Sequence, residues 1–333
     1  MISYLKLLEY FLIAFFFTLV ISPFVISILK REKIKQTILH YVDSHKLKNG
    51  TPTMGGLIFL ISISVVAFIC FENESLYAKL AVLIFLAYGT VGFLDDFIKF
   101  KFKRNLGLRA YQKIIFQLLV SLGAGFFVYR NIGSVILVPF TNKLIDLGWW
   151  IIPFVMFIYL AATNSVNLTD GLDGLATSTT LIYLMSFLIL ELIFVGKGIL
   201  LYNVSSIKEI KNISILITVV CGALLCFLLF NCFPAKIFMG DTGSLALGSL
   251  IASVSIFTGM ELYLPLLGIV FVASAVSVMM QVAYYKLTKK RIFLMAPLHH
   301  HFEKKGVHEV RITFCYSLVS ILVGLVVILI NIL

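Results

Sequence analysis

Residues 7–29 have the sequence LLEYFLIAFFFTLVISPFVISIL, a nearly unbroken run of apolar side chains. A helix needs about 20 such residues to cross the hydrocarbon core of a bilayer. The run is too long for the apolar part of a signal peptide and has no small-residue cleavage site, so we expect a retained first span. Similar runs recur along all 333 residues, of which 60% are hydrophobic and 13% charged. The chain is therefore predicted to be an all-α polytopic membrane protein.

Ten apolar runs give the expected spans. They lie near residues 8–29, 54–71, 78–97, 114–130, 149–163, 174–195, 213–230, 244–258, 264–287 and 312–332. No polar stretch between them is long enough for a core of its own, so residues 1–333 are expected to form one membrane-embedded domain. The five cysteines have no CxxC spacing and lie mostly in apolar runs, which favours packing roles over disulfides or a zinc site.

The net charge of +11 is unevenly distributed between the two faces that these spans define. Together with Lys286, 20 of the 27 Lys and Arg residues fall in loops 30–53, 98–113, 164–173, 231–243 and 288–311. The positive-inside rule makes that face cytoplasmic and puts both termini outside. The basic excess is thus mainly a topology signal, with anionic lipid or substrate as a secondary use, and we expect no nucleic-acid partner.

Histidine and aspartate show the same asymmetry. All six histidines and six of the seven aspartates lie on the predicted cytoplasmic face or at the span ends that meet it. The topology rule concerns Lys and Arg, so it does not account for this second bias. A reaction centre at the inner membrane interface would account for it.

The first acidic cluster is FLDDFIKF, residues 93–100. A helix starting near Ala78 carries Asp95 and Asp96 about 25 Å along its axis, which puts them at the cytoplasmic end of their span. Lys99 follows at i+4 and i+3, on the same helical face. The alternative interpretation is a solvated helix end with an ordinary salt bridge.

The second cluster is NSVNLTDGLDGLA, residues 164–176. Its polar residues recur every three positions, at Asn164, Asn167, Asp170 and Asp173, and they share one side if the segment is helical or tightly turned. A carboxylate near hydrocarbon is costly unless something neutralises it. Helix capping is the alternative, but a cap needs one such residue and this segment has several.

Three further segments add candidates. FNCFPAKIFMGDTGS, residues 230–244, puts Asp241 between glycines at a helix start, where it is either a cap or a metal ligand beside backbone N–H groups that favour phosphate. In APLHHHFEKKG, residues 296–306, three consecutive histidines cannot all face one ion, so a His₃ zinc site is not expected. One or two of them could bind phosphate. KLKNGTPTMGG, residues 46–56, joins a basic loop to a helix entrance, or is a plain connector.

Five aspartates from three loops on one face favour a divalent cation. Ligation by oxygen alone suits Mg²⁺, which is commonly bound by protein carboxylates and substrate phosphates together. Lys48, Lys99 and Lys113 would neutralise the rest of a diphosphate. Phosphoryl transfer needs this kind of positioning and charge stabilisation. The site lies at the membrane interface, where a water-soluble nucleotide and a membrane lipid could meet.

Five motifs in combination resemble one family. They are TPTMGG (51–56), DDFIK (95–99), NLTDGLDGLA (167–176), FMGDTGSLALG (238–248) and APLHHHFE (296–303). The chain is similar over essentially its whole length to the phospho-N-acetylmuramoyl-pentapeptide transferases (the MraY family), which belong to the polyprenyl-phosphate sugar-1-phosphate transferases. The resemblance is weakest in the loop 98–113.

The resemblance implies a bacterial inner-membrane enzyme, a single catalytic domain and a homodimer. It would transfer phospho-MurNAc-pentapeptide from UDP-MurNAc-pentapeptide to undecaprenyl phosphate, giving lipid I and UMP with Mg²⁺ present. The family pattern makes Asp95, Asp96 and Asp241 the essential carboxylates, with Asp241 the best metal ligand. It assigns the nucleotide pocket to Lys48, Thr53, Asn164, Asn167, Asp170, Asp173, Asn231 and Phe238, and the sugar-phosphate side to His299, His300 and His301.

Three alternatives are weaker. A sibling enzyme that moves GlcNAc-1-phosphate would share the aspartates but not TPTMGG and APLHHHFE. A cation-coupled transporter would carry its ionisable residues near the bilayer midplane, often in internal repeats, and no such repeat is found. An intramembrane metalloprotease would need HExxH, which does not occur. The sequence leaves open whether the lipid phosphate attacks directly or an aspartyl intermediate forms.

Overall fold

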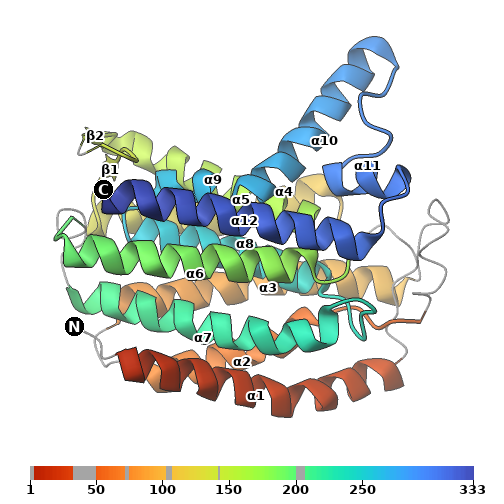
Figure 1. Ribbon diagram of the computed structural model, residues 1–333, viewed down its shortest axis with the longest axis horizontal. Coiled ribbons are helices and arrows are strands. Elements are labelled where there is room, and N and C mark those ends of the chain that lie inside the picture. Colours follow the sequence, from red (N-terminus) through yellow and green to blue (C-terminus); the bar gives the residue numbers. More distant parts are fainter. Residues whose placement is uncertain (1–3, 33–49, 72–74, 103–106, 142, 200–206) are drawn as a thin grey trace.

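The computed structural model of the protein describes residues 4–32, 50–71, 75–102, 107–141, 143–199 and 207–333 as a bundle of long helices (Figure 1). The α-helices are α1 (Tyr4–Arg31), α2 (Gly56–Cys70), α3 (Leu76–Lys101), α4 (Ala110–Asn131), α5 (Ile151–Thr169), α6 (Leu175–Gly196), α7 (Ile207–Asn231), α8 (Gly240–Phe257), α9 (Leu264–Leu267), α10 (Ile269–Thr288), α11 (Leu298–Lys304) and α12 (Glu309–Ile332). Two short strands, β1 (Val135–Leu137) and β2 (Leu144–Asp146), form an antiparallel hairpin. Short 3₁₀ turns are η2 (Gly148–Trp150) and η4 (Glu261–Tyr263).

The all-α polytopic fold is confirmed. Within the described ranges, nine helices are long and apolar enough to cross a membrane. The remaining predicted span, near residues 54–71, is shorter than expected. The corresponding helix α2 has only 15 residues, so it is about 22 Å long against about 30 Å of hydrocarbon. The backbone before it is bonded to another loop: Phe238 N–H donates to Pro52 O at 2.9 Å, and Gly55 N–H donates to Phe238 O at 2.8 Å. The helix therefore begins only at Gly56.

Two other predicted boundaries are corrected. The segment 164–173 is not all loop, because α5 continues through Thr169, so Asn164 and Asn167 lie on the last turns of a helix. The span predicted at 264–287 is interrupted at Gly268, which separates α9 from α10. Beyond this break, α10 leaves the bundle at an angle (Figure 1).

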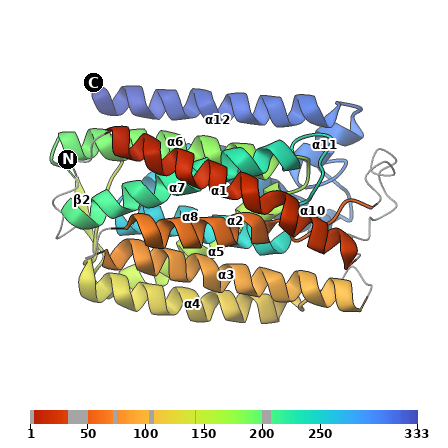
Figure 2. The same cartoon turned by 90° about the horizontal axis from the view of Figure 1, so that it is seen from below.

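The two ends of the bundle differ. The start of α1, the end of α12 and the β1–β2 hairpin lie at one end (Figure 1). The C-terminal end of α3, the short helix α11 and the loop between α10 and α11 lie at the other (Figure 2). That second end is the face on which the sequence concentrates its acidic and histidine residues, so the candidate site is expected there.

Helix α8 occupies the centre of the bundle, with 89% of its span buried. Glycines allow neighbouring helices to approach it closely. A Cβ atom at Gly92 of α3 would collide with the carbonyl oxygen of Asp241, and one at Gly56 of α2 would collide with the backbone of Gly243. Because these contacts join the ends of α2 and α3 to the first turn of α8, they bring distant sequence motifs into one place.

Candidate active site

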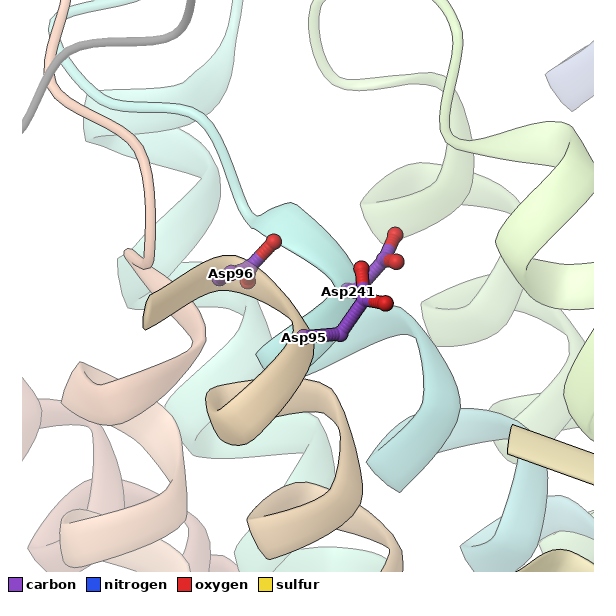
Figure 3. A group of neighbouring side chains, drawn as sticks. All are labelled: Asp95, Asp96 and Asp241. Carbon is purple, nitrogen blue, oxygen red and sulfur yellow. The ribbon is translucent and has the colours of Figure 1, made fainter. Parts of the chain in front are cut away.

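Three carboxylates from two helices form the centre of the site (Figure 3). Asp95 and Asp96 come from the last two turns of α3, and Asp241 comes from the first turn of α8. One oxygen of each lies within 4.8 Å of the others. The two helices are joined here by Thr242, whose N–H and hydroxyl both donate to Asp96 Oδ2, at 2.9 and 2.7 Å. The backbone N–H of Thr242, in the first turn of α8 where helical N–H groups lack partners within the helix, thus binds an acidic side chain of α3.

The three carboxylates differ in accessibility. The side chains of Asp95 and Asp96 are only 4% and 5% exposed, whereas that of Asp241 is 18% exposed. Asp95 Oδ1 accepts the N–H of Leu108 at 2.8 Å, and the preceding Gly107 has no room for a Cβ atom against the Asp95 side chain. Asp241 is therefore the carboxylate best placed to meet a ligand.

Two lysines neutralise this cluster. Lys99 Nζ lies 2.6 Å from Asp95 Oδ2, 3.7 Å from Asp96 Oδ1 and 3.0 Å from Asp241 Oδ2. Lys113 Nζ, from α4, lies 2.7 Å from the same Asp241 oxygen. The same-face relation of Lys99 to both aspartates, predicted from DDFIK, is confirmed. Like charges at this separation would otherwise suppress ionisation of one another.

The residues present fit a divalent cation. The candidate ligand atoms are carboxylate oxygens from three residues, which are hard ligands of the kind that Mg²⁺ prefers. Asp241 Oδ1 accepts the Nδ2–H of Asn167 at 2.7 Å, and the same amide nitrogen lies 2.8 Å from Ser244 Oγ. Asn167 therefore orients Asp241 in the way that outer-shell groups orient a ligand.

The remaining polar residues of the second cluster have separate surroundings. Asn164 donates to Gln117 Oε1 on α4 at 2.9 Å. Asp170 follows the end of α5, and burial, together with the charges of Asp241, Asp96 and Asp173, raises its pKa to about 8. Asp173 instead accepts the N–H of Ala235 at 3.0 Å. Of these residues, Asn167 contacts the three-carboxylate cluster directly.

The loop between α7 and α8 covers the site from another side. Asn231 is buried, with its amide bonded to Thr177 Oγ1 at 2.6 Å and to Ile237 O at 3.0 Å. Phe238 is half-buried and pairs through its backbone with residues 52–55. Thr53 is buried beside Gly240, where a Cβ atom would meet both Thr53 Oγ1 and Asp96 Oδ2. Lys48 lies outside the described residues.

The three consecutive histidines have different neighbours, as expected. His299 is fully buried, packs against Gly171, and has no hydrogen-bond partner for either ring nitrogen among the described residues. Burial, together with the nearby His300, lowers the pKa of His299 to about 3. His300 Nδ1 lies 2.9 Å from Glu303 Oε2, and His301 Nδ1 accepts the N–H of Leu294 at 3.1 Å.

Sequence reasoning missed three residues at the site. Thr242 and Ser244 lie one and three residues after Asp241 in the motif GDTGS, and their hydroxyls bond to Asp96 and Asn167. Gln117 lies four residues after Lys113, on the same face of α4. The closeness of Thr242 and Ser244 to Asp241 in the sequence could have indicated them, and helical spacing from Lys113 could have indicated Gln117. Only the fold shows what each of the three contacts.

Comparison with known proteins gives consistent matches. Residues 77–259 match the family model of glycosyl transferase family 4, and residues 48–60 match signature 1 of the phospho-N-acetylmuramoyl-pentapeptide-transferases. The phospho-N-acetylmuramoyl-pentapeptide-transferase of Clostridium novyi is 43% identical over 318 residues, which cover 95% of this chain and 94% of that one. The protein of the same name from Clostridium perfringens is 44% identical over 317 residues, covering 95% and 96%. That from Clostridioides difficile is 41% identical over 316 residues, covering 94% of each chain.

Proposed function

Because this chain belongs to the phospho-N-acetylmuramoyl-pentapeptide-transferase family, we propose that it transfers phospho-MurNAc-pentapeptide from UDP-MurNAc-pentapeptide to undecaprenyl phosphate. The products are lipid I and UMP, and the reaction serves peptidoglycan biosynthesis at the cytoplasmic face of the bacterial inner membrane. One observation carries the proposal: three carboxylates and two lysines converge at the end of a membrane-spanning bundle. A soluble nucleotide and a membrane lipid can both reach such a place.

The charged groups have complementary roles in this proposal. Asp241 is the principal ligand of Mg²⁺, and Asp95 and Asp96 complete the acidic set. When bound, the cation neutralises charge on the diphosphate and on the leaving UMP. Lys99 and Lys113, now paired with Asp241, turn to the substrate phosphates and hold their negative charge. The greater exposure of Asp241 supports its assignment over the two buried aspartates.

The polar residues around this centre are assigned to the nucleotide and the sugar phosphate. The nucleotide pocket comprises Lys48, Thr53, Asn164, Asn167, Asp170, Asp173, Asn231 and Phe238, and the sugar-phosphate side comprises His299, His300 and His301. Support differs among them. Asn167 bonds to Asp241, whereas the buried amide of Asn231 holds the loop that carries Phe238. We therefore assign Asn231 a supporting position in the pocket wall.

Direct attack by the lipid phosphate is the favoured route. Asp96 accepts two hydrogen bonds from Thr242, and Asp95 is bonded to Leu108 and paired with Lys99. A carboxylate held in this way is poorly placed to attack a phosphate, and the lipid phosphate is already an oxygen nucleophile. Enzyme and UDP-MurNAc-pentapeptide without lipid should then neither release stoichiometric UMP nor exchange labelled UMP into substrate. A UMP burst equal to the enzyme concentration would instead establish the covalent route.

The substrate assignment is tested with purified protein, Mg²⁺ and undecaprenyl phosphate. We expect lipid I and UMP from UDP-MurNAc-pentapeptide, and no comparable turnover of UDP-GlcNAc. A preference for UDP-GlcNAc would reject the muramoyl assignment in favour of the sibling transferases. Consumption of neither nucleotide would reject the reaction class. The homodimer implied by the family resemblance stays a prediction, which the mass of the detergent-solubilised protein would test.

A further inference from the structure

A polar contact lies one helical turn deeper in the bundle than the carboxylates. Gln117 of α4 is fully buried, and its Oε1 accepts the Nδ2–H of Asn164 from α5 at 2.9 Å. The orientation of both amides follows from the backbone. Asn164 Nδ2 also donates to Leu160 O at 2.8 Å, and a carbonyl can only accept, so the atom of Gln117 that faces this nitrogen is its oxygen.

The same residue also connects α4 to α3. The hydroxyl of Tyr88, from the middle of α3, donates to the backbone carbonyl of Gln117 at 3.0 Å. Tyr88 is itself buried and stacks on Tyr159 of α5, with ring centroids 5.9 Å apart. Gln117 thus joins three helices, and each of them carries a charged or amide group of the site.

Helix α4 has little else to hold its first half in place. Among its residues from Ala110 to Gly123, only Gln117 and Ser121 are buried, and the buried small and apolar positions begin at Ala124. The outward residues of this half are exposed apolar side chains, including Ile114, Ile115 and Leu119. Of the apolar residues in this half, only the partly buried Val120 packs against the core, so polar contacts largely set the position of the half-helix.

Lys113 depends on that position. It lies one turn before Gln117 on the same face of α4, and its Nζ contacts Asp241 Oδ2 at 2.7 Å. A displacement of α4 along or away from α5 moves Lys113 directly. The charged contact itself cannot anchor the helix during turnover, because the proposed reaction requires Lys113 to exchange Asp241 for substrate phosphate.

We propose that Gln117 is a positioning residue, which locks the first half of α4 against α5 and thereby holds Lys113 in register with Asp241. This inference rests on the proposed function only for the role of Lys113 in turnover. Gln117 contacts no substrate; it acts through the helix. The unpartnered Nε2 of Gln117 among the described residues agrees with a role carried by its oxygen alone.

A double-mutant cycle tests the coupling. Gln117→Met keeps the length of the side chain and removes the acceptor, and it should lower kcat about 10- to 100-fold, as for a catalytic group displaced by about 1 Å. The effect on kcat should exceed the effect on the KM of either substrate. In a Lys113→Met background, the same change should lower kcat by no more than about threefold further, since the two residues act as one unit. Equal loss in both backgrounds, or near wild-type kcat in Gln117→Met, would overturn the proposal.

Leu119→Ala is the matched control. Leu119 lies in the same half of α4 but on its exposed side, away from Gln117 and its partners, so its loss should leave kcat near the wild-type value. An equal loss of kcat in this control would contradict a specific role for Gln117.

Hydrogen exchange gives a second readout that needs no turnover. Backbone amides of residues 110–117 should exchange faster in Gln117→Met than in the wild-type protein, while those of residues 124–131 stay protected. Unchanged exchange at 110–117 would reject the anchor, whatever the activity. Faster exchange in a protein that consumes no nucleotide would reject the transferase reaction and retain the anchor, so the two failures are distinguishable.

Discussion

At the scale of single residues, the site is made of acids whose surroundings differ. Asp95 and Asp96 are adjacent in sequence, yet one bonds to Leu108 and the other to Thr242 of a different helix. The motif DDFIK predicts the Lys99 contacts, because helical spacing alone determines them. Helical spacing could not show that carboxylate oxygens of Asp95, Asp96 and Asp241 lie within 4.8 Å of one another. This grouping depends on how α3 packs on α8, about 145 positions later in the chain.

His299 gives a residue-scale prediction. Its ring is buried beside His300 and Glu303, and its pKa of about 3 lies below the ordinary value of 6.5. Below pH 6.5 the unfolded chain binds a proton at this residue and the folded protein does not, so stability falls as pH decreases. One such group costs about 2 kcal/mol between pH 6.5 and 5. Thermal unfolding in detergent should show this loss, and His299→Phe should reduce it.

The control for this prediction is Phe302→Leu on the same short helix. Neither side chain ionises, so this replacement should leave the pH dependence of unfolding unchanged. If His299→Phe unfolds with the same pH dependence as the wild-type protein, His299 does not stay neutral in the fold.

At the scale of elements, apolar length predicts the helices well and their ends poorly. The α5 helix extends past the expected boundary because Asn164 and Asn167 continue it, each with its side chain bonded inside the bundle. α2 begins late because residues 52–55 pair with the loop before α8. The β1–β2 hairpin was not predicted. The late end of α5 and the late start of α2 both depend on contacts between segments that are distant in sequence, which hydropathy does not report.

The close approach of α3 and α8 is tested by Gly92→Ala. The new methyl group would collide with the carbonyl oxygen of Asp241, so either the helices separate or the site distorts. We expect a loss of about 1–3 kcal/mol in unfolding free energy, as for other overpacked cores, together with a large loss of turnover.

The matched change is Gly123→Ala in α4, where a Cβ atom would meet nothing within 4 Å. Alanine has the higher helix propensity, so this variant should be at least as stable as the wild-type protein. Equal behaviour of the two variants would contradict the tight α3–α8 contact.

At the scale of the whole molecule, the charge pattern and the fold agree on one point. The end of the bundle where α3 ends and α11 lies (Figure 2) carries Asp95, Asp96 and Asp241, together with Lys99, Lys113 and Lys304 among the described residues. The sequence predicted this concentration from the topology rule and from the bias of aspartate and histidine. It could not predict that α10 leaves the bundle after the break at Gly268 (Figure 1).

The orientation in the membrane is open to a direct test. Lys236 lies in a predicted cytoplasmic loop and Lys143 in a predicted outer one, and both are exposed. Single cysteines at these positions, in a background without native cysteines, should react with an impermeant reagent from opposite sides of the membrane. Labelling of both from one side would reject the predicted topology and the outward location of both termini.

The central claim is that the three-carboxylate cluster is a cation-dependent transfer centre. The most direct measurement is the rate of lipid I formation against free Mg²⁺, in the wild-type protein and in Asp241→Asn. We predict that chelation abolishes wild-type turnover and that Asp241→Asn remains slower by orders of magnitude at saturating Mg²⁺, with its fold intact. Near wild-type turnover by Asp241→Asn, or undiminished wild-type turnover without divalent cation, would contradict the account.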